Sequence, residues 1–211
     1  MKNILICFFI FFAQNSFSAD WQYWSENLAS HKISDKENLG LGYYNYFSKT
    51  VSDSYFQFIT VNYSNKFYKN FGGYLEFYSE SSLKSDKTWK GSTYIVPGFF
   101  YDIVVSDNLS FKIMDRFYYF LTSPSKFDYH RPRISVSLKN GKNVFLISDE
   151  LRMDLTGSRP YNFYRNRLFI SGSRKISSNL TLGLSYIIQE DKSSKAWEST
   201  NIIQSSIKLD F

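Results

Sequence analysis

The sequence predicts an all-β protein that folds as one closed, antiparallel, transmembrane β-barrel. Apolar and polar residues alternate along most of the chain, whereas few stretches repeat apolar residues at helical spacing. The connections between these stretches alternate between short and long, which is typical of outer-membrane barrels with short periplasmic turns and longer outer loops. After the N-terminal segment, no stretch approaches 18 consecutive apolar residues, so no transmembrane helix is expected.

The first residues have the pattern of a secretory signal peptide. Lys2 precedes an unbroken apolar run over 4–13, which is too short for a membrane span of about 20 residues. Small residues at the usual positions place the cleavage site after Ser18. We therefore expect 1–18 to be removed and 19–211 to form a single barrel domain.

The composition of the mature chain excludes several kinds of chemistry. Cys7 is the only cysteine and lies in the signal peptide, so no disulfide, thiol nucleophile or cysteine metal site is expected, and no cofactor is indicated. The mature net charge of +5 is spread along the chain and does not suggest nucleic-acid binding. Aromatic residues make up 20% of the chain, and tyrosine and tryptophan are favoured at membrane–water interfaces.

Ten segments carry a strand pattern, and a weaker eleventh segment precedes them at 20–30. A barrel whose two ends both lie in the periplasm needs an even number of strands. We therefore expect ten strands, with 20–30 at the periplasmic rim or in the lumen; twelve strands are the alternative if 20–38 contains two short ones. The ten segments are 39–47, 54–63, 71–80, 91–104, 109–121, 132–139, 143–154, 162–175, 180–190 and 199–211.

The two faces of these segments differ as the two faces of a barrel wall must. In 132–139, for example, Ile134, Val136 and Leu138 share one face, and polar residues share the other. One face can then meet lipid while the other meets a wet lumen. Because lipid cannot satisfy an unpaired backbone edge, the sheet must close on itself.

A few positions carry local signals that differ from the regular alternation. Asp115 and Asp149 fall on the apolar face of their segments, which either a β-bulge or a position near the membrane interface would explain. Pro97 interrupts 91–104, and a bulge would account for it as well. The Asn-Gly pair in the connection at 140–142 predicts a type I′ hairpin.

In the last strand segment, the apolar face continues up to the final residue of the chain. Ile207, Leu209 and Phe211 alternate with polar residues up to the final position. This pattern resembles the C-terminal signature by which the assembly machinery recognises bacterial outer-membrane barrels. We therefore expect that machinery and outer-membrane lipid as partners, and localisation in the outer membrane of a Gram-negative bacterium.

A more specific likeness lies in the C-terminal half. The stretches "FLISDELRMDL", "NFYRNRLFISGSRKISSNLTLGLSYIIQED" and "NIIQSSIKLDF", together with "DWQYW" near the mature N-terminus, resemble the bacterial outer-membrane barrels of domain-of-unknown-function family 2490. The resemblance implies the fold and the location, and it implies no activity because the function of that family is unknown. The matching residues are Asp20, Trp21, Trp24, Glu150, Arg152, Asn166, Arg167, Leu168, Leu182, Gly183 and Tyr186.

Charged residues on the polar faces are the candidate functional residues. Acidic side chains of 143–154 should lie beside arginines of 162–175, and opposite charges on adjacent strands stabilise pairing by about 0.2–1 kcal/mol each. Such a set either lines a pore or packs into an ionic lumen that fixes the strand register; packing is favoured because small barrels fill themselves with side chains. The expected lumen charges are Lys112, Arg116, Arg133, Lys139, Glu150, Arg152, Asp154, Arg165 and Arg167.

The sequence favours functions without catalysis. His31 and His130 are the only histidines, and neither belongs to a recognisable catalytic motif. His130 lies in a connection that we expect to be a long loop. A small passive channel or a structural barrel is the leading hypothesis; a lipid-modifying enzyme of the acyl hydrolase type, which would need a serine–histidine pair, and a surface-contact protein are the alternatives.

Overall fold

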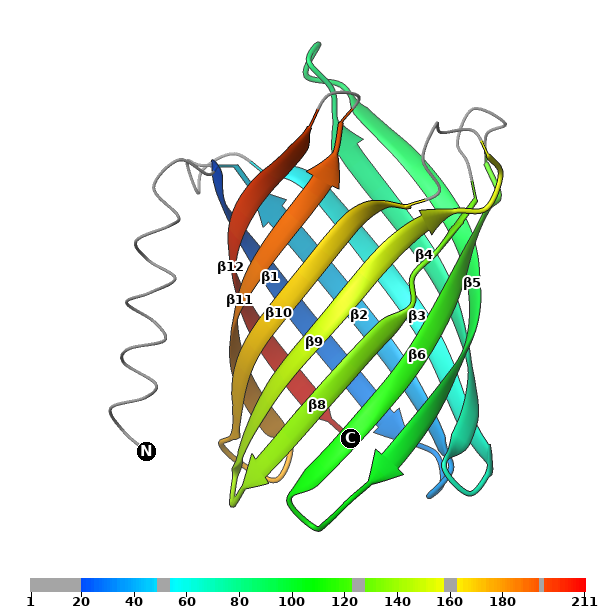
Figure 1. Ribbon diagram of the computed structural model, residues 1–211, viewed down its shortest axis with the longest axis vertical. Coiled ribbons are helices and arrows are strands. Elements are labelled where there is room, and N and C mark those ends of the chain that lie inside the picture. The colour runs from blue at the N-terminus through cyan, green and yellow to red at the C-terminus, as the bar shows by residue number, and fades with distance from the viewer. Residues whose placement is uncertain (1–19, 49–53, 123–127, 158–162, 194–195) are drawn as a thin grey trace.

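A computed structural model describes residues 20–48, 54–122, 128–157, 163–193 and 196–211. The expected signal peptide and its cleavage site after Ser18 lie outside these residues. The described residues contain no helix that is long and apolar enough to cross a membrane. They form one sheet that closes into a barrel (Figure 1), so the predicted closed all-β barrel is confirmed.

Over the residues that the structure describes, the barrel wall has eleven strand positions, between the expected ten and the alternative of twelve. One position is shared by two pieces, β7 and β8, which both pair with β6 on one side and β9 on the other. The strands are β1 (Asp20–Lys32), β2 (Glu37–Phe47), β3 (Ser54–Tyr68), β4 (Phe71–Leu83), β5 (Trp89–Val104), β6 (Leu109–Phe120), β7 (Tyr129–His130), β8 (Arg133–Asn140), β9 (Asn143–Asp154), β10 (Phe163–Lys175), β11 (Leu180–Lys192) and β12 (Trp197–Asp210).

The first strand is part of the wall, so the expectation that 20–30 lies at the rim or in the lumen is wrong. β1 pairs antiparallel with β2 and parallel with β12, where eleven residue pairs run from Asp20–Thr200 to Ser30–Asp210. A parallel seam closes a barrel with an odd number of strands, because the first and last strands then point the same way. The requirement for an even number fails for this reason: the two ends of the described barrel lie at opposite rims (Figure 1).

The pieces β7 and β8 form one strand position that is interrupted at Arg131 and Pro132. Proline cannot donate to the ladder, but the neighbouring groups continue it: Arg131 N–H donates to Arg116 O at 2.8 Å, and Leu151 N–H donates to Pro132 O at 3.0 Å. The pairing register is the same on both sides of the interruption. The expectation that His130 lies in a long loop is therefore wrong, because it belongs to the wall.

The connections alternate in length as predicted. Those at one rim have two to four residues, and those at the other have four to eight. We call these ends the short-turn rim and the long-loop rim. The connection after β8 is Gly141–Lys142, one residue later than Asn-Gly, and only Gly141 has a positive φ, at 59°. A type I′ turn needs positive φ at both central residues. The predicted turn type is therefore wrong, although the predicted hairpin is present.

The outer surface of the wall is apolar. Ile59, Ile134 and Leu184 are each more than half exposed in mid-strand. The last strand follows the predicted parity, since Ile207, Leu209 and Phe211 are all exposed on this surface. Aromatic side chains gather on it near both rims, with Trp21, Trp89 and Trp197 at the long-loop rim and Phe67, Tyr68, Phe71, Tyr101 and Phe211 at the short-turn rim.

Both acidic exceptions to the alternation face outward. No register shift occurs between β5 and β6 at Asp115, or between β8 and β9 at Asp149, so the bulge explanation is wrong for both. Pro97 likewise lies in an unshifted register, opposite Leu75. Asp149 lies at mid-strand in β9 and is exposed. A position near the membrane interface therefore does not explain why this acidic residue lies on the apolar face.

Candidate luminal site

The barrel encloses a main cavity of about 870 Å³. Its lining extends from Val144 and Ser173, near the short-turn rim, to Gln22 and Asp191, near the long-loop rim. The cavity therefore covers most of the height of the wall between β8 and β11. A second cavity, of about 530 Å³, lies at the short-turn rim. The described lumen is thus only partly filled by side chains.

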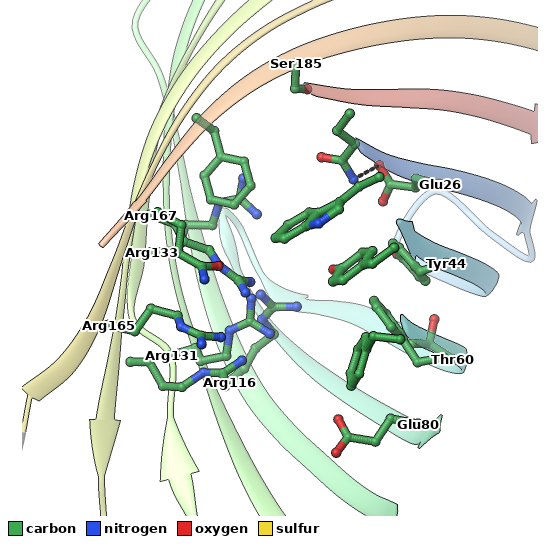
Figure 2. A pocket seen from close by; sticks show the side chains of 18 of the residues that line it. Glu26, Tyr44, Thr60, Glu80, Arg116, Arg131, Arg133, Arg165, Arg167 and Ser185 are labelled. Carbon is green, nitrogen blue, oxygen red and sulfur yellow. Dashed lines mark hydrogen bonds between the residues drawn. The ribbon is translucent and has the colours of Figure 1, made fainter. Parts of the chain in front are cut away.

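Among the described residues, the arginines that line the main cavity all lie on one wall, which we call the arginine wall. It extends from β6 to β10, where alternation directs every second side chain inward. Five of these arginines gather on one side of the lumen in Figure 2. The arginines that line the cavity are Arg116, Arg131, Arg133, Arg152, Arg165 and Arg167.

Glu150 is the carboxylate on which this wall converges. It is 2% exposed and accepts from Arg116 Nη2 at 2.9 Å and from Arg131 Nε at 3.0 Å. Arg167 and Arg133 lie farther away, at 3.8 and 4.0 Å. A buried carboxylate of this kind is tolerated only when cations and hydrogen bonds compensate for its lost hydration. Removing it would leave several guanidinium groups buried without their counter-charge.

The remaining arginines use other partners. Arg165 contacts Asp191, Arg167 donates to Gln189 Oε1 at 2.7 Å, and Arg133 donates to Ser148 Oγ at 2.8 Å. The expected pairing of strand 143–154 with strand 162–175 is thus correct only in part. Asp154 accepts from the backbone and hydroxyl of Thr156, both at 2.8 Å.

The opposite wall, formed by β1 to β5, is aromatic and acidic, and we call it the tyrosine wall. Trp24 stacks on Tyr46 with ring centroids 3.8 Å apart, and Tyr44 stacks on Phe58 at 4.1 Å. Its charged lining residues are the three acids Glu26, Glu76 and Glu80. Figure 2 shows Glu26, Tyr44 and Glu80 across the lumen from the arginines. The cavity is therefore polarised from one wall to the other.

The other expected lumen charges lie apart from the main cavity. Lys112 lines the second cavity, where its Nζ is 3.7 Å from Asp102. Lys139 follows the inward parity of β8 but is exposed near the short-turn rim and lines neither cavity. Asp154 is buried near the other rim. The expected charges are thus spread along the full height of the barrel.

Three side chains that line the main cavity were not among the lumen charges expected from the sequence. Arg131 falls beside Pro132 in a segment without alternation, and Glu26 falls in the segment that we did not assign to the wall. Glu80 lies at the end of its expected strand, which continues to Leu83. For Arg131, the polar and proline-rich surroundings hide the strand signal. For Glu26, the alternation with Trp24 is compatible with a strand, but the expectation of an even number of strands left this segment out of the wall.

An outward acid–histidine pair lies on the other side of the same wall. His130 Nδ1 is 3.1 Å from Asp115 Oδ2, and its ring stacks on Phe117 with centroids 5.6 Å apart. Among the described residues, no serine hydroxyl hydrogen bonds to His130. Nor do the described ranges hold a cluster of three or more histidine, cysteine or acidic residues that could bind a metal.

Comparisons with known proteins give no further identification. No protein-family model matches the chain, and no curated protein matches it significantly. The resemblance to domain-of-unknown-function family 2490 therefore stays a prediction. Hypotheses about function rest on the geometry of the barrel and its lumen.

Proposed function

We propose that the protein is an outer-membrane barrel that forms a narrow channel for small polar solutes. The observation that carries this proposal is the polarised cavity, which covers most of the height of the wall between β8 and β11. A barrel of about eight strands is just wide enough for side chains to fill it, whereas a wider barrel leaves space that a solute can enter. Charged rings in a low-dielectric wall focus the electric field and select among ions.

Planar-bilayer recording of the refolded protein tests this proposal. We expect discrete single-channel currents with a preference for anions, because six arginines and four acids of the described part of the chain line the main cavity. Refolding should be checked beforehand by the gel shift between unboiled and boiled samples. A correctly folded protein without conductance, or one that is cation-selective, would contradict the proposal.

The proposed membrane location makes the outer surface sensitive to charge. Leu184, which is 61% exposed, and Ser185, which lines the cavity, are neighbours that face opposite sides of β11. Leu184→Arg should cost about 2–4 kcal/mol of folding free energy in lipid. Ser185→Arg should cost clearly less. Equal losses in urea titrations of vesicle-bound protein would argue against a lipid-facing surface at Leu184.

The proposed orientation has the short-turn rim in the periplasm. Because β1 crosses the wall and runs antiparallel to β2, Asp20 lies at the same rim as the loop residue Asp86, and Ser34 lies at the opposite rim. Single cysteines at Asp20 and Asp86 should react with an impermeant maleimide on intact cells, and one at Ser34 only after lysis. If the cysteine at Asp20 reacted like the one at Ser34, β1 would not cross the wall, and its parallel seam with β12 would be wrong as well.

Lipid hydrolysis is a second candidate, and the outward contact between Asp115 and His130 favours it. An acid can orient a histidine that acts as a general base. The test is phospholipid hydrolysis by the refolded barrel. His130→Ala should abolish fatty-acid release and His31→Ala should not; absence of release from the wild type would eliminate this candidate.

A further inference from the structure

Arg152 differs from the other arginines that line the main cavity. The other five each have a carboxylate oxygen within 4.0 Å. Arg152 makes no ion pair with any residue that the structure describes, and its buried Nε has no hydrogen-bond partner there. A buried guanidinium N–H without an acceptor is costly. Arg116 Nε also lacks a partner among the described residues, but Arg116 still donates through Nη2 to Glu150. Arg152 is therefore the one cavity arginine of the described protein that makes neither an ion pair nor a hydrogen bond through its side chain.

The surroundings hold the guanidinium of Arg152 in place without neutralising it. Its Cζ lies 4.5 Å from the ring centroid of Tyr129 and 6.0 Å from that of Tyr164. Stacking on aromatic faces restricts the plane of a guanidinium and leaves its N–H edge available for a planar acceptor. The positive charges of Arg131 and Arg165 act on it from the same wall. Arg152 therefore adds an uncompensated positive charge to a part of the wall that is already positive.

We propose that Arg152 is the principal ligand of a luminal binding site for an oxyanion, that is, a carboxylate or phosphate group on a small solute. The guanidinium would donate two parallel hydrogen bonds to two oxygens of the anion, as arginine does with both groups. Arg131 and Arg165 would add positive potential, although each already contacts an acid. The site deepens the proposed function, on which it rests, because it requires that solutes enter the lumen.

Calorimetric titration of the refolded barrel with inorganic phosphate, and separately with acetate, tests the site. We expect saturable binding of at least one of the two anions, and the stronger of them identifies the preferred group. Arg152→Gln should weaken that binding by about tenfold or more, as expected for loss of a charged hydrogen-bond pair. Arg174→Gln removes the same charge from an exposed position of β10 and should leave binding unchanged.

The outcomes separate this inference from the channel. No saturable binding to the folded wild type, or equal weakening by Arg152→Gln and Arg174→Gln, would overturn the site even if the protein conducts. Binding that depends on Arg152 in a barrel without conductance would keep the site and reject the channel. If Arg152→Gln does not fold, Arg152→Lys keeps the charge but loses the paired donors, so it should still bind several-fold more weakly; binding equal to that of the wild type would reject the site.

Discussion

The two walls of the lumen are built from the same strand alternation but are stabilised in different ways. The tyrosine wall packs rings on rings, as in the stacks of Trp24 on Tyr46 and Tyr44 on Phe58. Such contacts act at short range and need no counter-charge. The arginine wall packs like charges side by side and depends on Glu150 to hold Arg116 and Arg131. The charge balance at the centre of this wall therefore depends on one carboxylate.

The two walls therefore tolerate the loss of a side chain to different degrees. Loss of one ring from the tyrosine wall removes one set of contacts and leaves its neighbours stacked. Loss of Glu150 removes the shared partner of several buried cations, and a buried cation without a partner is far more costly than a missing contact. The same difference creates the polarity of the cavity, because the lining arginines lie on one side and three of the four lining acids lie on the other.

The largest expected effect is that of Glu150→Gln. It leaves Arg116 and Arg131 buried without their carboxylate and should cost about 3–5 kcal/mol of folding free energy, measured by urea titration in phospholipid vesicles. Glu190→Gln is the matched control, since Glu190 is exposed and should change stability by less than about 0.5 kcal/mol. Similar losses for the two variants would mean that Glu150 is not the centre of the arginine wall.

A smaller effect is expected on the tyrosine wall. Phe58 stacks on Tyr44 and lies 4.8 Å from the ring centroid of Tyr78. Phe58→Leu keeps an apolar side chain but removes the ring contacts, and should cost about 1 kcal/mol in the same titration. Phe145→Leu, on the outer surface, is the control and should be nearly neutral. A loss at Phe58 as large as that at Glu150 would erase the contrast between the walls.

The smallest effect concerns ion selectivity, provided that the barrel conducts. Arg133→Gln removes a positive charge from the arginine wall and should move the reversal potential in a salt gradient toward cations. Glu80→Gln, on the opposite wall, should move it toward anions. Lys139→Gln is the control: Lys139 lines neither cavity, so its loss should have no effect. Shifts of the same sign at Arg133 and Glu80 would contradict a polarised lumen.

Most of the wall could be predicted because its signal is local. The period of two in β8 and β11 assigns Ile134 and Leu184 to the outer surface, and the structure confirms both. The ends of the strands were predicted less accurately: β3 continues to Tyr68, beyond the expected end at 63. Ser64, Asn65 and Lys66 resemble a turn in sequence, but pairing with β2 and β4 keeps them extended. Neighbouring strands thus overrode a weak local preference.

The candidate site was predictable as a list of inward charges but not as an arrangement. Arg116, Arg133 and Arg167 were expected in the lumen, and all three line the main cavity. Their shared contact with Glu150 was not predictable, because it brings together residues of β6, β8, β9 and β10. The distance between such residues depends on strand register and barrel curvature, which alternation alone does not encode.

By itself, the sequence determined the fold class, the apolar outer surface and the outward face of Ile207, Leu209 and Phe211, because each follows from which residues alternate along a single strand. Only the tertiary structure decided the strand number and the direction of the seam, since these depend on whether Asp20–Lys32 pairs with Trp197–Asp210, far away in the chain. It also decided that the arginines face the tyrosines. Closing the sheet into a cylinder places strands that are far apart in the sequence on opposite sides of the lumen. Because one set of strands carries the arginines and the other the tyrosines and acids, the closed lumen is polarised.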